Sequence, residues 1–339
     1  MRFYRRPTVN PSVLIVAEAA QGFEGDVRLA RLLVRAAAAG RADIVKFQLV
    51  FADELETRDY PYYDLFKQLE MTDAAWTSVV DEAKTHGLGV AFDVFGLRSL
   101  GLAVELGALA VKIHASDFFN GPLIEAALAR APQVWFSAGG ITVDEITGFI
   151  ERAGLRAANL TLMYGFQAEP TPIGANHLAR LGALRSRFPD LRLGFMDHAA
   201  GSSEEAGWLA LLAMPFGVSV LEKHVTVARD LKIEDDVSAL EPREFAAFAA
   251  RVRGAEQALG QAALTLTAAE EAYRQRAVKV VVTVRALPAG HRVESSDIAL
   301  LRARLSADPA TIVRVAEVTG KTLVRAVEAG QPLGKDDLS

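Results

Sequence analysis

Polar and ionisable side chains stand at the ends of short apolar runs in this sequence, where a buried strand would otherwise stay apolar. They include two lysines, three histidines and four carboxylates, namely Glu18, Lys46, Gln48, Asp93, Lys112, His114, Ser137, Tyr164, Asp197, His198, Glu222 and His224. Side chains of these types can bind anions, hold a divalent metal or transfer protons. Their repeated position at the ends of runs predicts that they meet in one site.

Lys46 and Lys112 lie within otherwise apolar runs. Lysine is rarely buried unless it is paired, so the two lysines favour a binding site for a phosphate or carboxylate group. The alternative is that each lysine pairs with a nearby carboxylate such as Glu18 or Asp93. A desolvated lysine can also form an imine with a carbonyl substrate, which leaves a Schiff-base enzyme open.

His198 and His224 end two successive runs and could share one divalent cation. Two imidazoles, completed by water and substrate oxygens, make an open site that can act as a Lewis acid. A hydrogen-bonded histidine pair that orients loops is the alternative. The chain has 0 cysteines, which excludes disulfides, thiolate metal sites and cysteine nucleophiles.

Two loops add weaker signals. Ser137-Ala138-Gly139-Gly140 precedes a helix expected from about Thr142, and free N–H groups at a helix start suit an anion, although glycines also simply close turns. The stretch Glu169-Pro170-Thr171-Pro172 is a rigid loop that needs no function beyond its geometry.

The elements that position these residues are strand-length apolar runs separated by segments of helical spacing. The runs are 13–18, 43–48, 88–93, 109–114, 133–137, 160–164, 192–197 and 218–224. Eight β-α units before residue 260 predict a (β/α)8 TIM barrel, in which the strand ends converge on one mouth. A doubly wound sheet is the competing arrangement. Residues 51–75 are expected to form a long loop over the mouth.

A second pattern follows the barrel units. Arg285-Ala-Leu-Pro-Ala-Gly290 with Asp297-Ile298 is matched by Arg325-Ala-Val-Glu-Ala-Gly330 with Asp337-Leu338. Glycine in a tight turn, a short strand and an Asp-initiated turn would explain both copies. We expect a small β-rich domain with internal two-fold character, in which Arg292, Arg302, Arg304 and Arg314 are available to an anionic ligand.

Composition sets the class of protein. The 339 residues are 51% hydrophobic and 23% charged with a net charge of -5, which indicates a globular chain and does not favour nucleic-acid binding. The N-terminal apolar run is too short for a secretory signal or a membrane span. We therefore expect a cytoplasmic protein without a membrane or nucleic-acid partner.

The order and spacing of several motifs resemble the N-acetylneuraminate (sialic acid) synthase family, including its spore-coat polysaccharide relatives. The matching pieces are Glu18 with Gly25-Asp26, Lys46-Phe47-Gln48, Lys112-Ile113, Ser137-x-Gly139, Pro170-Thr171-Pro172, Asp197-His198, Glu222-Lys223-His224 and Leu240-Glu241-Pro242. The C-terminal part resembles the antifreeze-like (SAF, β-clip) domain of the same enzymes. The predicted domains are a synthase barrel at 1–262, a linker helix at 263–277 and the SAF domain at 278–339.

The resemblance implies a condensation of phosphoenolpyruvate with the aldehyde of an open-chain N-acetylated hexosamine, giving a sialic (nonulosonic) acid for surface polysaccharide. It places a divalent metal, Mn²⁺ or Mg²⁺, on His198 and His224. It also implies a homodimer in which the SAF domain of one chain covers the other chain's mouth. Phosphoenolpyruvate would be held by Lys46, Lys112 and Ser137, and the rest of the site would be lined by Glu18, Gln48, Phe95, Asp117 and Asp235, with Arg302 reaching the N-acyl group across the dimer.

The sequence departs from the family at several of these positions. Asp93 replaces a threonine, Ala115 followed by Ser116 replaces a serine, and Met196 replaces another serine. Beyond the sixth run the family's His-Cys-Thr-Asn pattern and the tyrosine before Pro-Thr-Pro become Tyr164, Gly165, Phe166, Gln167 and Glu169. We expect Asp93, Ser116 and Gln167 to contact substrate, in a pocket with fewer hydroxyl donors.

Three functions remain open on the sequence. The first is the phosphoenolpyruvate-dependent synthase. The second is a related barrel lyase or aldolase that uses the metal or a Schiff-base lysine without phosphoenolpyruvate, as the Asp93, Ala115 and Met196 departures would allow. The third is a non-catalytic carbohydrate-binding relative.

Overall fold

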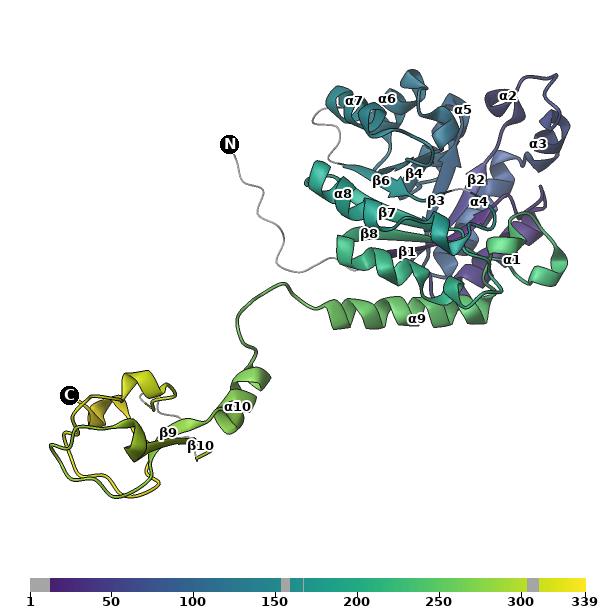
Figure 1. The fold of residues 1–339 in the computed structure, drawn as a ribbon. Helices are drawn as coiled ribbons and strands as arrows, with labels where there is room; N and C mark the ends of the chain where they lie inside the picture. Colours follow the sequence, from purple (N-terminus) through teal and green to yellow (C-terminus); the bar gives the residue numbers. More distant parts are fainter. Residues whose placement is uncertain (1–12, 154–158, 167, 304–310) are drawn as a thin grey trace. The chain divides into compact units, whose positions relative to one another are not determined.

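Eight parallel strands close into a barrel in which each strand pairs with the next along the chain and β8 pairs with β1 (Figure 1). The computed structural model describes residues 13–153, 159–166, 168–303 and 311–339. The strands are β1 (Leu14–Ala20), β2 (Ile44–Leu49), β3 (Gly89–Val94), β4 (Ala110–Ile113), β5 (Val134–Ser137), β6 (Leu160–Tyr164), β7 (Arg192–Asp197) and β8 (Val218–His224). This closure confirms the (β/α)8 barrel. It excludes a doubly wound sheet, because such a sheet has two edge strands that each lack a neighbour on one side.

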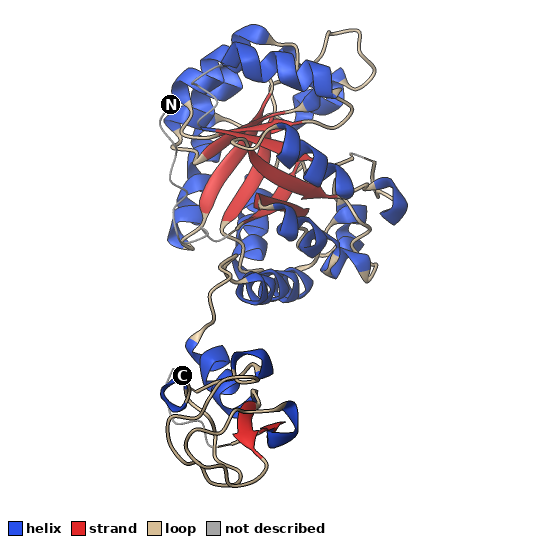
Figure 2. Ribbon diagram, turned by 60° about the vertical axis from the view of Figure 1, so that its left-hand side comes forward, coloured by secondary structure: helices blue, strands red, loops and turns tan. Residues whose placement is uncertain are grey.

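Helices surround the barrel and cover the outer faces of its strands (Figure 2). The α-helices that follow strands are α1 (Val27–Ala39), α4 (Asp73–Thr85), α5 (Leu97–Glu105), α6 (Gly121–Arg130), α7 (Val143–Ala153), α8 (Ala179–Arg187) and α9 (Pro242–Leu259). Between β7 and β8 the chain instead forms the 3-10 helices Glu205–Gly207 and Leu209–Phe216. The short helices α2 (Ala52–Leu55) and α3 (Tyr63–Leu69) lie in the connection predicted as a long loop.

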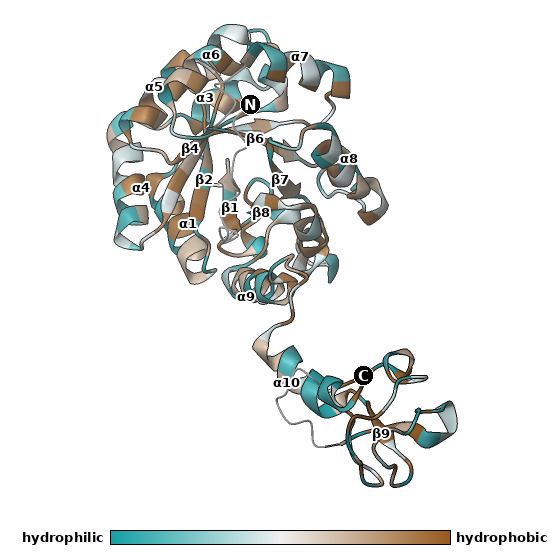
Figure 3. Cartoon of the chain, turned by 90° about the vertical axis from the view of Figure 1, so that its left-hand side faces the viewer, coloured by the Kyte–Doolittle hydropathy of each residue, from teal (hydrophilic) through white to brown (hydrophobic). Residues whose placement is uncertain are grey.

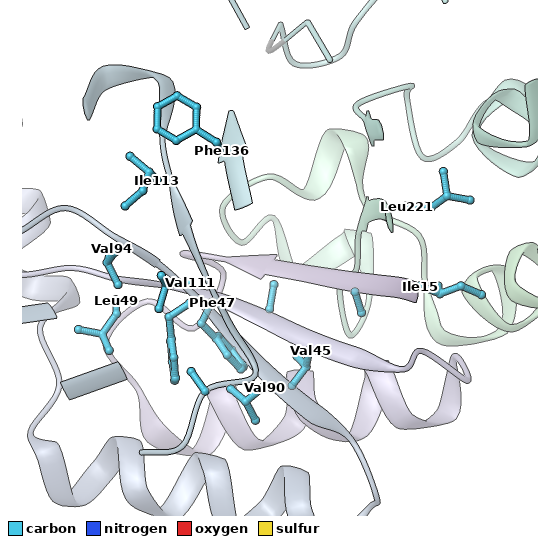
Figure 4. Close-up of a cluster of buried hydrophobic side chains, with 14 of the residues drawn as sticks. Ile15, Val45, Phe47, Leu49, Val90, Val94, Val111, Ile113, Phe136 and Leu221 are labelled. Atoms are coloured by element: carbon cyan, nitrogen blue, oxygen red, sulfur yellow. The ribbon is translucent and has the colours of Figure 1, made fainter. Parts of the chain in front are cut away.

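The main core lies between the strands and these helices. Outward-facing strand residues such as Val45, Phe47 and Val90 belong to it (Figure 4), and Trp76 of α4 meets the rings of Phe23, Phe47 and Phe92 edge-on. Figure 3 shows the same division as hydrophobic strands inside helices of mixed character. Because side chains alternate along a strand, the intervening residues must fill the barrel interior.

An apolar layer fills part of that interior. Its members come from all eight strands and form one buried cluster separate from the main core, made of Val16, Ile44, Ala91, Ala110, Trp135, Met163, Met196 and Val220. Residues from every strand of a closed barrel can meet in this way only inside it. The layer therefore closes the barrel beneath the next set of inward-facing residues.

The chain divides into the units Met1–Gln261 and Ala262–Ser339. The second unit contains α10 (Ala268–Ala277) and an antiparallel pair, β9 (Val280–Thr283) and β10 (Ile298–Leu301). In its two repeats, Arg285 donates to Asp297 at 2.6 Å and Arg325 donates to Asp337 at 2.5 Å, while Gly290 and Gly330 adopt positive φ. The repeated motif thus forms the same turn twice.

No helix in the described ranges is long and apolar enough to cross a membrane.

Candidate active site

A layer of polar side chains lies directly above the apolar layer. Seven of its members stand two residues beyond an apolar-layer residue on the same strand or at its end, and all are buried: Glu18, Lys46, Asp93, Lys112, Ser137, His198 and Glu222. Residues two apart on a strand face the same side, so the strand geometry stacks this charged layer on the hydrophobic one. The sequence prediction of one shared site rests on this same alternation.

Ion pairs join the charged members into one network across the barrel. Lys46 is in contact with both Glu18 and Asp93. The ammonium group of Lys112 lies 2.6 Å from an oxygen of Glu222 and 3.7 Å from Asp93, and Lys46 lies 3.7 Å from Glu222. Both lysines are thus paired with carboxylates. The sequence analysis gave this pairing as the alternative to an anion-binding site.

The network contains three carboxyl groups and two ammonium groups, so one proton is needed to balance its charge. Burial raises the pKa of Glu18 to about 8, and repulsion from Glu222 and Asp93 adds to the rise against the attraction of Lys46. Burial would also raise the pKa of Glu222, but Lys112 and Lys46 outweigh it and lower that pKa to about 2. Glu18 therefore carries the balancing proton at neutral pH.

Two histidines and two carboxyl groups lie beside the ion network, on the same cavity. The rings of His198 and His224 have centroids 5.2 Å apart. Glu169 places Oε1 at 3.5 Å from His224 Nε2 and 4.0 Å from His198 Nε2, while Asp235 lies 3.7 Å from His224 Nδ1. Burial lowers the pKa of both imidazoles, with His224 adding to the effect on His198. Both rings are therefore neutral at pH 7, the form that binds metals.

These residues fit a divalent cation. Glu169, His198 and His224 each offer a ligand atom within 4.8 Å of the others. A carboxylate beside the far nitrogen of a ligating histidine is the usual outer-shell partner of such a site, and Asp235 holds that position for His224. The Nδ1 atom of His198 is buried and has no hydrogen-bond partner among the described residues.

A cavity of about 240 Å³ opens over both groups of residues. It is lined by Glu18, Gln48, Lys112, His114, Glu169, His198, Glu222, His224 and Asp235. Lys46 and Asp93 complete the ion network with these residues, and the hydroxyl of Ser137 is buried in the same layer without a partner among the described residues. The cavity therefore offers a substrate ammonium groups, carboxyl groups and imidazoles on neighbouring walls.

Other predicted site residues lie elsewhere. Phe95 is buried with its ring 6.3 Å from that of His114, and Ser116 donates to Asp117 at 3.2 Å. These three do not line the cavity. Arg302 is an exposed residue of the second unit, and Gln167 lies outside the described residues.

One cavity residue, Glu169, was missed by sequence reasoning, whereas Glu222 and His114 were already among the polar residues expected to share a site. Glu222 stands two residues before His224 on β8, and this spacing already placed the two side chains on one face. Glu169 precedes Pro-Thr-Pro in a loop, where spacing carries no information about direction. The only sequence signal for Glu169 was that it replaces the tyrosine that the family has at this position.

The NeuB family profile matches residues 33–263, and the SAF domain profile matches residues 278–339. The chain belongs to the NeuB family. This confirms the resemblance found in the sequence, and the SAF match agrees with the repeated C-terminal motif.

Named relatives in this family are acid synthases. The chain is 27% identical over 264 residues to the N,N'-diacetyllegionaminic acid synthase of Campylobacter jejuni, covering 73% of this chain and 77% of that protein. It is 25% identical to the enzyme of the same name from Legionella pneumophila, covering 94% and 92%. The crystal structure of N-acetylneuraminic acid (sialic acid) synthetase from Leptospira borgpetersenii in complex with citrate matches with a TM-score of 0.72 and 26% identity, covering 78% of this chain and 92% of that one.

Proposed function

We propose that this NeuB-family protein condenses phosphoenolpyruvate with the aldehyde of an N-acetylated hexosamine to form a nonulosonic acid for surface polysaccharide. The observation that carries the proposal is one cavity lined by the buried Lys112 and by two neutral histidines, His198 and His224. Lys46 is joined to this cavity through the ion network. Relatives named as legionaminic and sialic acid synthases support the substrate class.

In the proposed reaction, C3 of phosphoenolpyruvate forms a bond to the aldehyde carbon, and the aldehyde oxygen becomes a hydroxyl group. Water adds at C2, and phosphate leaves to give the 2-keto acid. Lys46, Lys112 and Ser137 hold the anionic groups of phosphoenolpyruvate. Charged ammonium groups in a site with little water attract phosphate more strongly than exposed ones do, although Asp93 and Glu222 compete for them.

Glu18 is the proton carrier of this proposal. Within the ion network its carboxyl group is the one that is protonated at pH 7, and it lines the cavity. A backbone N–H of Ala20 donates to its Oε1 at 2.7 Å and fixes its orientation. Glu18 can therefore protonate the aldehyde oxygen as the carbon–carbon bond forms.

His198 and His224 would hold the divalent metal, Mn²⁺ or Mg²⁺. Bound there, the metal would act as a Lewis acid on the aldehyde. Gln48, fixed by a 2.6 Å hydrogen bond from Gln21, and Asp235 line the same cavity and would orient the sugar. The resemblance extends the proposal to Phe95, Ser116, Asp117 and Gln167 as substrate contacts.

The proposal also covers assembly and location. It takes the protein to be a cytoplasmic homodimer in which the SAF domain of one subunit covers the barrel mouth of the other. Arg302 would then contact the N-acyl group of the sugar. The family matches show that the chain has the two domains that this arrangement requires.

Phosphate release tests the proposal directly. The protein is incubated with phosphoenolpyruvate, MnCl₂ and a panel of N-acetylated hexosamines, and inorganic phosphate and the 2-keto acid are both quantified. We expect phosphate to appear only with an acceptor sugar and in equal amount to the keto acid. Lys112→Met should abolish both products, whereas Glu204→Gln, which changes an exposed carboxylate of the loop after β7, should leave both unchanged. Absence of phosphate release across the whole panel would refute the proposal.

A further inference from the structure

Glu169 is the residue at the mouth that the proposed function does not use. It lies in the loop between β6 and α8 and is partly exposed, with 31% of its side chain accessible. Its Oε1 nevertheless faces both imidazoles, at 3.5 Å from His224 Nε2 and 4.0 Å from His198 Nε2. One carboxylate oxygen thus sits between the two nitrogens that face the cavity.

The loop that carries Glu169 is tied to the strand end that carries His198. The backbone N–H of Thr171 donates to the carbonyl oxygen of His198 at 2.9 Å. The buried Thr171 hydroxyl group lies 2.7 Å from the carbonyl oxygen of Ala168 and 2.8 Å from that of Phe166. These bonds hold the backbone on both sides of Glu169, so the fold keeps this stretch of the loop beside His198.

The second histidine is held in a corresponding way. His224 faces Glu169 through Nε2 and Asp235 through Nδ1, at 3.5 and 3.7 Å. Its backbone carbonyl accepts a 3.0 Å hydrogen bond from the N–H of Leu240. The nitrogen that points to Glu169 is therefore the one left for a ligand, while the other faces the carboxyl group of Asp235.

We propose that Glu169 is the third protein ligand of the divalent metal, so that this chain binds it through two imidazoles and one carboxylate. The inference rests on the proposed function for the role of the metal, but not for its binding. Where the resembling family has a tyrosine before Pro-Thr-Pro, this chain has a carboxylate. One negative charge added to two neutral imidazoles strengthens the attraction for a dication, and the mixed nitrogen and oxygen set suits first-row divalent metals.

Binding of Mn²⁺ to the full chain, in the absence of phosphoenolpyruvate and sugar, tests the proposal. Free Mn²⁺ is followed by its EPR signal during titration, and calorimetry gives an independent dissociation constant. We expect Glu169→Gln to weaken Mn²⁺ binding by about tenfold or more, since loss of even an outer-shell partner weakens metal binding by about 10–100-fold. Glu169→Tyr, which restores the family residue, should weaken it similarly.

Glu204→Gln is the matched control, because it removes an exposed carboxylate on another loop of the same unit and lies outside the Glu169–His198–His224 cluster. It should bind Mn²⁺ as the parent does. Circular dichroism spectra of all variants should coincide, since Glu169 is on a surface loop.

Failure of this inference is distinguishable from failure of the proposed function. If Glu169→Gln binds Mn²⁺ with an affinity within twofold of that of the parent, Glu169 is not a ligand of the metal. This conclusion would hold even if the parent releases phosphate from phosphoenolpyruvate. A parent that does not bind Mn²⁺ at millimolar concentration would also overturn the third ligand. Weakened binding in Glu169→Gln would support the ligand, even if no sugar on the panel is turned over.

Discussion

Two layers of side chains fill the barrel interior only two residues apart along the strands, yet their chemistry is opposite. The lower layer contains Ile44, Met163 and Val220 among its members and is apolar throughout. The upper layer contains Lys46 and Glu222 in the positions above Ile44 and Val220, and it is mostly charged. At about 3.3 Å per residue the layers are separated by about 7 Å.

The comparison shows how a barrel can bury five ionisable groups. The lower layer excludes water by packing, as any core does. The upper layer is just as buried, but its charges neutralise one another across the ring, and a proton on Glu18 completes the balance. Because every charge has its partner on another strand, the polar layer is stable only as a complete set.

The strongest way to break the set is to remove a shared cation. Lys46→Met leaves Glu18 and Asp93 buried without the ammonium group that contacts both. We expect the free energy of unfolding to fall by about 3–5 kcal/mol, as when one partner of a buried ion pair is lost, together with loss of phosphate release. Urea denaturation at pH 7, followed by circular dichroism, measures the change. A loss below about 1 kcal/mol would mean that the layer is not mutually neutralised.

A milder change removes the titration of Glu18 and keeps its shape. Folded Glu18 keeps its proton up to a pKa of about 8, whereas unfolded Glu18 loses it near the ordinary value of 4.5. Between these values the folded state binds more protons, so this group makes the free energy of unfolding decrease as pH rises. Glu18→Gln should therefore show a smaller decrease between about pH 5 and pH 8 in urea melts at closely spaced pH values. Parallel curves for parent and variant would contradict the assignment of the proton to Glu18.

Removing a neighbouring charge should shift this proton without removing its carrier. Asp93 is one of the groups that raise the pKa of Glu18, and Asp93→Asn takes away its repulsion. We expect the pKa of Glu18 to fall from about 8 toward its ordinary value. The infrared band of the protonated carboxyl group, followed against pH and assigned by its absence in Glu18→Gln, measures this. An unchanged titration would show that repulsion from Asp93 does not contribute to the raised pKa of Glu18.

The smallest effect is expected in the apolar layer. Ile44→Val removes one methylene group directly below Lys46 and should lower the free energy of unfolding by about 0.5–1.5 kcal/mol. The KM for phosphoenolpyruvate and the pH dependence of stability should stay as in the parent. A changed KM would show that the two layers are mechanically coupled, so that the apolar layer and the charged layer could not be treated as independent.

Sequence reasoning was most successful where strand periodicity applies. The alternation of Lys46 with Gln48 and of Glu222 with His224 predicts that each pair points to one side, and all four side chains lie in the cavity or in the ion network beside it. The same reasoning did not reach Glu169, because a loop has no fixed period. Ser116 and Asp117 were expected as substrate contacts, but they bond to each other outside the cavity.

Local sequence patterns are enough to specify the eight strand-length runs, the two-residue alternation that places a charged layer over an apolar one, and the motifs of the NeuB family. Which charged groups contact one another depends instead on the folded chain. Lys112 pairs with Glu222, 110 residues away, because closing the barrel brings β4 and β8 to face each other across its interior. Glu169 reaches the histidines because Thr171 ties its loop to the end of β7. Such contacts depend on the closed ring and on the path of a loop, which no local pattern encodes.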